Sequence, residues 1–158
     1  MLIRAKLSKN VRCVKVIDTT KEVLSKVGCR VEAFKEESNK DGRFIIFKTT
    51  IKDRGVLKYS MTRIKVELGK SLDGIDTKED LNSITQQEIA NLRKLIDMTA
   101  KEISSIGMEM LEIDNDISLK EANKISKTTE LSKKVKRLFL MNQKLSHYIY
   151  CIEEGCNL

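Results

Sequence analysis

Five side chains in this sequence have the chemistry to bind a metal or to act as a nucleophile and its base. They are the single histidine and the four cysteines, namely His147, Cys13, Cys29, Cys151 and Cys156. The cysteine pairs are separated by 15 and by 4 residues, and neither spacing matches a zinc module. We interpret the cysteines as buried free thiols. We interpret His147, which lies among serine and tyrosine residues, as a partly exposed polar residue.

Other catalytic patterns are incomplete. The acidic turn 114–116 resembles the start of a calcium loop, but Leu119 stands where the loop needs glycine and Ile125 where it needs a bidentate glutamate. The sequence contains no glycine-rich phosphate loop and no G-x-S-x-G nucleophile motif. We therefore expect a protein that is not an enzyme, with no cofactor, no metal and no small-molecule substrate.

Charge is the chemistry that remains, and it is divided into three blocks. Residues 1–70 contain 18 Lys/Arg and 8 Asp/Glu, a net charge of +10. Residues 71–118 contain 4 and 11, a net charge of −7, and residues 119–158 contain 8 and 4, a net charge of +4. The sum is the total of +7. A block as basic as the first suggests a surface for an anionic partner.

The candidate nucleic-acid-binding residues are nine cations of the first block that fall on predicted strands or turns. They are Arg4, Lys6, Arg12, Lys48, Lys52, Arg54, Lys58, Arg63 and Lys65. Clustered positive charge is sufficient to contact phosphates, and such binding weakens steeply with salt. A basic face that is merely solvated is the competing interpretation. Phe44 and Phe47 fall on opposite faces of their predicted strand, which favours core packing over base stacking.

The first 70 residues are predicted to form an antiparallel sheet with one short helix. Alternating apolar residues indicate the strands, and Asp-Gly at 41–42 indicates a hairpin turn. In the last strand the apolar parity changes near Thr62, which we interpret as a bulge or a sharp twist. A capping pattern at Thr19 and Glu22 starts the helix, and Gly28 ends it. The predicted strands are 3–7, 11–17, 30–36, 43–52 and 57–68.

The rest of the chain has helical periodicity. Apolar residues recur at intervals of three and four over 77–113 and over 119–154. Thr77 with Asp80, and Ser118 with Glu121, have capping spacing at the two helix starts. An acidic first helix and a basic second helix would attract each other, and this attraction would set the register of an antiparallel hairpin.

These elements predict an α+β protein, with a basic antiparallel sheet followed by a long, coiled-coil-like helical hairpin. The expected parts are a basic β-rich domain at 1–70, a linker at 71–76 and the hairpin at 77–158. A two-helix hairpin exposes apolar surface, which either packs over the sheet or pairs with a second chain. We expect a homodimer. The predicted oligomer interface is Leu131, Val135, Leu138, Asn142, Leu145 and Ile149.

Two functions remain open. One is a nucleic-acid-binding protein that dimerises through the hairpin and contacts phosphates through the basic sheet. The other is a protein-binding inhibitor or adaptor that docks on an acidic protein surface, such as a phage or mobile-element factor acting on host machinery. The apolar run at the start is too short for a signal peptide, and no stretch is long enough to span a bilayer. We therefore expect a cytoplasmic protein, or one in the host cytoplasm, with no membrane partner.

Overall fold

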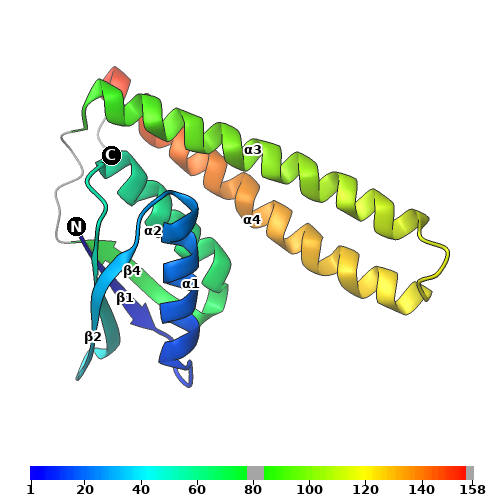
Figure 1. Cartoon of the computed structure of the whole chain (residues 1–158), viewed down its shortest axis with the longest axis horizontal. Coiled ribbons are helices and arrows are strands. Elements are labelled where there is room, and N and C mark those ends of the chain that lie inside the picture. The colour runs from blue at the N-terminus through cyan, green and yellow to red at the C-terminus, as the bar shows by residue number, and fades with distance from the viewer. Residues whose placement is uncertain (78–83, 156–158) are drawn as a thin grey trace. The chain divides into compact units, whose positions relative to one another are not determined.

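The computed structural model describes residues 1–77 and 84–155 and divides the chain into two compact units (Figure 1). The first unit, Met1–Leu92, holds a four-stranded sheet, two helices and the first turns of a third helix. The second unit, Arg93–Leu158, holds the rest of that helix and a fourth one. The elements are β1 (Leu2–Leu7), α1 (Cys13–Lys26), β2 (Val31–Asn39), β3 (Gly42–Thr49), α2 (Arg54–Leu68), the 3₁₀ turn η1 (Gly69–Ser71), β4 (Leu72–Thr77), α3 (Gln86–Asn115) and α4 (Glu121–Glu154).

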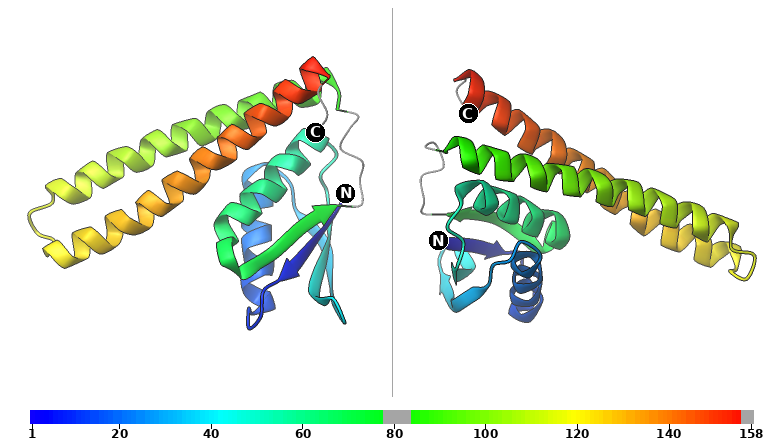
Figure 2. Two further views of the ribbon diagram at one scale, coloured as in Figure 1. Left: turned by 180° about the vertical axis from the view of Figure 1, so that it is seen from behind. Right: turned by 45° about the horizontal axis from the view of Figure 1, so that its top comes forward.

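The sheet has the strand order β2-β3-β1-β4, and every neighbouring pair is antiparallel. With α1 after β1 and α2 after β3, the unit has the βαββαβ order of the ferredoxin-like arrangement. Both helices lie on the same face of the sheet (Figure 2). The opposite face of the sheet carries alternate strand residues that no helix of this unit covers.

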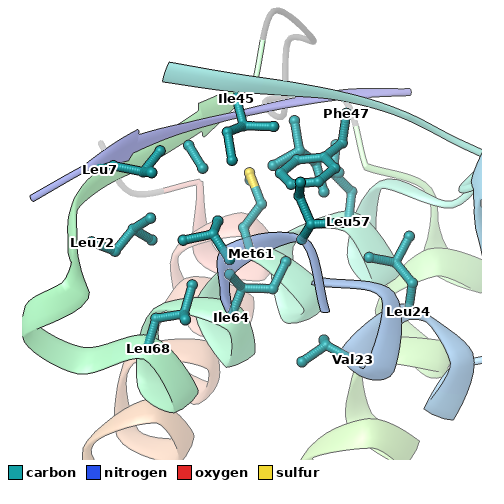
Figure 3. Packing of buried hydrophobic residues seen from close by; sticks show 14 of the residues in the cluster. Leu7, Val23, Leu24, Ile45, Phe47, Leu57, Met61, Ile64, Leu68 and Leu72 are labelled. Carbon is teal, nitrogen blue, oxygen red and sulfur yellow. The ribbon is translucent and has the colours of Figure 1, made fainter. Parts of the chain in front are cut away.

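The core of the first unit lies between the sheet and these two helices. Ile3, Ala5 and Leu7 of β1 alternate inward, because successive residues of a strand point to opposite faces. Figure 3 shows Ile45 and Phe47 of β3 packed among side chains of both helices. The helical residues of this core are Val16, Ile17, Val23 and Leu24 of α1 and Leu57, Met61, Ile64 and Leu68 of α2.

The predicted fold class is confirmed, with an antiparallel sheet at the N-terminus and two long helices after it. Two of the five predicted strands are wrong. Residues 11–17 contain the start of α1, and residues 57–68 belong to α2. The unit therefore has two helices where the sequence analysis expected one. The predicted end of the first helix holds, because Gly28 follows α1 with a φ of 73°.

The second helix forms because its apolar residues recur at helical intervals. Leu57, Met61 and Ile64 are separated by four and three residues and all face the core. Asp53 caps the helix, since its side chain accepts a hydrogen bond from the backbone N–H of Val56. The parity change near Thr62 is thus a helical period and not a bulge.

The predicted linker at 71–76 is also wrong, because most of it forms the edge strand β4. Thr77, predicted to start a helix, ends this strand, while its predicted partner Asp80 lies outside the described residues. The helix α3 begins later, after a capping box at Thr85 and Glu88. The backbone N–H of Thr85 donates to Glu88 Oε2 at 2.8 Å, and the backbone N–H of Glu88 donates to Thr85 Oγ1 at 3.2 Å.

In the second unit α3 and α4 run antiparallel, side by side. Arg93 pairs with Glu153 at one end, and Lys124 Nζ donates to the backbone carbonyl of Asp114 near the other. The predicted capping box at Ser118 is wrong: the cap residue of α4 is Lys120, and Ser118 donates instead to Asp116. One ion pair between the acidic first helix and the basic second helix joins Lys134 to Glu102 at 3.7 Å.

A glycine-to-alanine pair tests the packing of α2 on the start of α3. A Cβ at Gly55 would lie 2.7 Å from the backbone oxygen of Glu88, whereas a Cβ at Gly74 meets nothing within 4 Å. Replacing glycine inside a helix or strand otherwise favours folding by about 0.5–1 kcal/mol. We expect Gly55→Ala to lower the free energy of unfolding in urea and Gly74→Ala to maintain or raise it. Equal effects of both substitutions would contradict the packing.

The capping box makes stability depend on pH. Burial raises the pKa of Glu88, but hydrogen bonds from the backbone N–H of Arg54 and from Thr85 outweigh it, so the pKa lies below its ordinary value. The carboxylate therefore stabilises the folded chain above the ordinary glutamate pKa, and this contribution is lost as the pH falls through the lower folded pKa.

We expect Glu88→Gln to cost about 1 kcal/mol at neutral pH, as loss of a cap usually does. The difference from the wild type should shrink in urea unfolding at about pH 3. A difference that stays constant between the two pH values would show that the charge of Glu88 contributes nothing.

Candidate nucleic-acid interface

The uncovered face of the sheet holds two of the candidate cations above an aromatic ring. The register places Lys6 opposite Phe44 and Arg4 opposite Ile46. The Arg4 guanidinium carbon lies 5.1 Å from the centre of the Phe44 ring, and Lys6 Nζ lies 6.0 Å from it. Phe44 is only 9% exposed, and Phe47 is buried on the other face. The two phenylalanines thus lie on opposite faces, as predicted.

Most cations of this face already have a carboxylate partner. The ion pairs are Arg4–Asp76, Lys35–Glu37 and Lys48–Glu32, with N–O distances of 2.7, 3.2 and 3.8 Å. Arg4 donates two hydrogen bonds to Asp76, and these bonds raise the pKa of the guanidinium. Because each pair places opposite charges together, the uncovered face is not a strongly basic surface.

Four of the nine candidates lie on α2 and not on a strand. They are Arg54, Lys58, Arg63 and Lys65. Arg63 is 3% exposed, and its guanidinium pairs with Glu67 at 2.8 Å. Lys65 is exposed, whereas Arg54 and Lys58 are half-buried. Arg54, Lys58 and Lys65 lie along one side of the helix, four and seven residues apart, whereas Arg63 lies on the opposite side, so the four do not form one surface.

The other candidates are also separated. Lys52 is exposed just after β3, near the chain's first residue, because the N-terminal amine donates to the carbonyl of Ile51. Arg12 is exposed at the cap position of α1, which follows the opposite end of β1. The nine predicted residues therefore do not converge, although the expectation of exposed positive charge in this unit holds for several of them.

A different set of cations does converge, at the end of the sheet where β1 leads into α1. We call it the basic corner: the five exposed residues Lys9, Arg12, Lys15, Arg43 and Lys70. They come from the turn after β1, the start of α1, the start of β3 and η1. Only Arg12 belongs to the set that the sequence predicted.

Hydrogen bonds bring these segments together. Arg43 Nη1 donates to the backbone carbonyl of Val11 at 3.0 Å, and Nη2 donates to Cys13 Sγ at 3.3 Å. Lys15 Nζ donates to Ser71 Oγ at 3.0 Å, beside Lys70. The turn after β1 is tied to η1, since the Ser8 hydroxyl donates to the carbonyl of Lys70 at 2.6 Å.

The local electrostatics of the corner favour an anion. Among the described residues no carboxylate forms an ion pair with any of the five cations. The nearby carboxylate of Asp73 accepts from Ser8 Oγ at 2.7 Å. The first turn of α1 has no acidic residue and no side-chain cap. The positive end of the helix dipole therefore adds to the charge of the side chains.

The sequence analysis did not identify Lys9, Lys15, Arg43 and Lys70, and the misplaced strand at 11–17 accounts for Lys15. A signal was present nonetheless. Residues 8–17 contain Lys9, Arg12 and Lys15 and no acidic residue. With α1 beginning at Cys13, Arg12 and Lys15 fall at the N-terminus of a helix. Arg43 and Lys70 join them only through the tertiary fold.

The predicted oligomer residues lie on α4, and three of them are already buried in the single chain. Leu138, Leu145 and Ile149 are at most 4% exposed. Leu131, Val135 and Asn142 are half-buried. A second chain is thus not needed to bury most of this apolar stripe.

The residues with catalytic or ligating chemistry are scattered. Cys13 begins α1, Cys29 lies between α1 and β2, and Cys151 is buried in α4, 3.4 Å from His147 Nε2. Cys156 lies outside the described residues. Within the described residues no three His, Cys, Asp or Glu side chains are grouped as a metal site. Likewise, none of the described helices is long and apolar enough to cross a membrane.

Comparisons of the chain with protein-family models, with curated proteins and with solved structures found no match. The ferredoxin-like arrangement hosts many unrelated functions, so the topology alone assigns none. Function has to be argued from the residues and their geometry.

Substitutions at two cations of α2, Arg63 and Lys65, test which of them has a structural role. We expect Arg63→Ala to lower the free energy of unfolding by about 2–3 kcal/mol, because it leaves the half-buried Glu67 carboxylate without this partner. Lys65→Ala, at an exposed position two residues away, should change it by less than about 0.5 kcal/mol. Urea unfolding of both variants measures the difference. Similar small effects would contradict a structural role for Arg63.

Proposed function

We propose that this protein is a non-enzymatic binding protein that contacts nucleic-acid phosphates through the basic corner. The proposal rests on one observation: five exposed cations from four segments converge there, and no described carboxylate pairs with them. Positive charges gathered on one surface repel one another, so a bound anion relieves their mutual repulsion.

The kinds of groups at the corner favour phosphate as the anion. Proteins contact nucleic-acid phosphates with Arg and Lys side chains, hydroxyls, backbone N–H groups and helix N-termini. The corner contains Arg and Lys side chains and a helix N-terminus, with Arg12 and Lys15 beside the uncapped start of α1. An acidic protein surface would use the same cations, and polyglutamate represents such a surface in the test of the proposal.

We expect the protein to contact the sugar-phosphate backbone of the nucleic acid more than its bases. Phe44 is the aromatic ring on the uncovered sheet face nearest to such a role, but Arg4 and Lys6 lie against it and leave it 9% exposed. Base stacking needs an open aromatic face. We therefore expect little sequence preference.

A salt titration with matched variants tests the proposal. The binding variant is Arg12→Gln, Lys15→Gln, Lys70→Gln, which retains Arg43 because its guanidinium holds the turn. The control variant is Lys26→Gln, Lys35→Gln, Lys48→Gln, which removes the same charge from cations that are paired with carboxylates. Fluorescence anisotropy with labelled duplex DNA and single-stranded RNA gives the affinity between about 50 and 200 mM salt.

For duplex DNA we expect the slope of log affinity against log salt to fall by up to about 2.7 in the binding variant, at about 0.9 for each phosphate that is no longer neutralised. The control variant should keep the wild-type slope. Equal reductions in both variants would mean that net charge alone drives binding. Failure of the wild type to bind any nucleic acid at low salt, or binding of polyglutamate in preference to it, would overturn the proposal.

A further inference from the structure

The helical hairpin of the second unit has a groove along one face. Three surface hollows follow one another between α3 and α4, and the central one has a volume of about 530 Å³. The central hollow is lined by Ala100, Ile103, Phe139, Asn142, Gln143 and Ser146. The flanking hollows continue it toward Arg93 at one end and Asp114 at the other. We call this row of three hollows the hairpin groove.

The lining residues share one side of each helix. On α3 they recur at intervals of three or four residues over most of the stretch from 93 to 114, and on α4 they do so from 128 to 149. This stretch of helix is about 32 Å long, and two helices side by side are about 20 Å wide. The face therefore offers about 600 Å², near the roughly 800 Å² per partner of a stable protein interface.

Two features of the central hollow indicate that a single chain leaves side chains there without packing or hydrogen-bond partners. Phe139 is 55% exposed at its edge, although a phenylalanine side chain gains most from burial. Asn142 lies in the apolar stripe of α4, and its Oδ1 is buried without a hydrogen-bond partner. A single polar residue in such a stripe commonly specifies how helices associate.

We propose that the hairpin groove is the docking surface for the same groove of a second copy, related by a two-fold axis parallel to the hairpin. In this arrangement α3 of one copy packs against α4 of the other, and all neighbouring helices are antiparallel. Segments at the same level along the hairpin face each other across the axis. The inference uses only the second unit and does not depend on phosphate binding.

The net charges of α3 and α4 favour this arrangement over one with a two-fold axis perpendicular to the hairpin. In α3 residues 93–115 contain five acidic and three basic residues, a net charge of −2, while α4 contains four and seven, a net charge of +3. An axis parallel to the hairpin places each acidic helix against a basic one. An axis perpendicular to it would place α3 on α3 and α4 on α4, with like charges together.

The same axis completes the central hollow. Phe139, Ala100 and Ile103 line one hollow and so lie at one level of the hairpin. Phe139 of one copy therefore packs against Ala100 and Ile103 of the other. The two Asn142 side chains approach each other across the axis, where each amide can donate to the other's oxygen.

Sedimentation velocity of the full chain at about 50 µM tests the docking surface, because association depends on protein concentration. The wild type should sediment as a dimer, with twice the 18.1 kDa mass of one chain. Phe139→Asp should sediment as a monomer. Leu140→Asp is the matched control, because Leu140 is 49% exposed but does not line the groove, and it should remain a dimer. A monomeric wild type, or a dimeric Phe139→Asp, would overturn the proposal.

Lysine cross-linking of the wild type tests the axis without any substitution. In a mixture of ¹⁴N- and ¹⁵N-labelled chains, links between chains carry both isotopes. A parallel axis places the two hairpin tips together, so Lys120 and Lys124 should link to the same residues of the other copy. Links from Lys120 to Lys94 or Lys144 of the other copy would show the perpendicular axis and contradict the arrangement.

Discussion

The burial of one face of the sheet under α1 and α2 is the constraint on which the rest of the first unit depends. It fixes the inward residues of β1 and β3, with Ile3 paired to Phe47 and Ala5 to Ile45. It also requires α1 to begin just after β1 ends, so that Val16 and Leu24 reach the core. The turn between them must then be short, and its cations cannot lie far from the end of the sheet.

Because of this geometry, the basic corner does not lie on the uncovered sheet face, where the predicted alternation of strand residues would place the positive charge. The uncovered face balances Arg4, Lys35 and Lys48 with carboxylates of the same sheet. Five exposed cations that form no ion pair with a described carboxylate gather at the corner, where two chain turns and a helix start meet. The net charge of +10 over residues 1–70 therefore predicts a binding surface less well than the distribution of that charge does, because paired charges cancel locally and clustered ones add.

The sequence predicted the architecture better than the individual elements. Apolar residues at intervals of three and four over long stretches predicted α3 and α4. Strict alternation of apolar and polar residues predicted β1. Residues 11–17 were misread because Val11, Val14 and Val16 favour strands, yet packing against the sheet overrides that preference. The candidate cations are dispersed for the same reason, because residues 13–17 and 57–68 are helical and not strands, which places four of the nine candidates on α2. Contacts such as Arg43 with Val11 join residues 32 positions apart, and no local pattern contains them.

The most direct test of the account is an NMR titration of the ¹⁵N-labelled protein with a short duplex DNA at low salt. If the basic corner binds the phosphates, the largest chemical-shift changes fall on the backbone amides of residues 9–15, Arg43 and Lys70. Changes concentrated on the uncovered sheet face, at Arg4, Lys35 and Lys48, would contradict the account, as would the absence of any change.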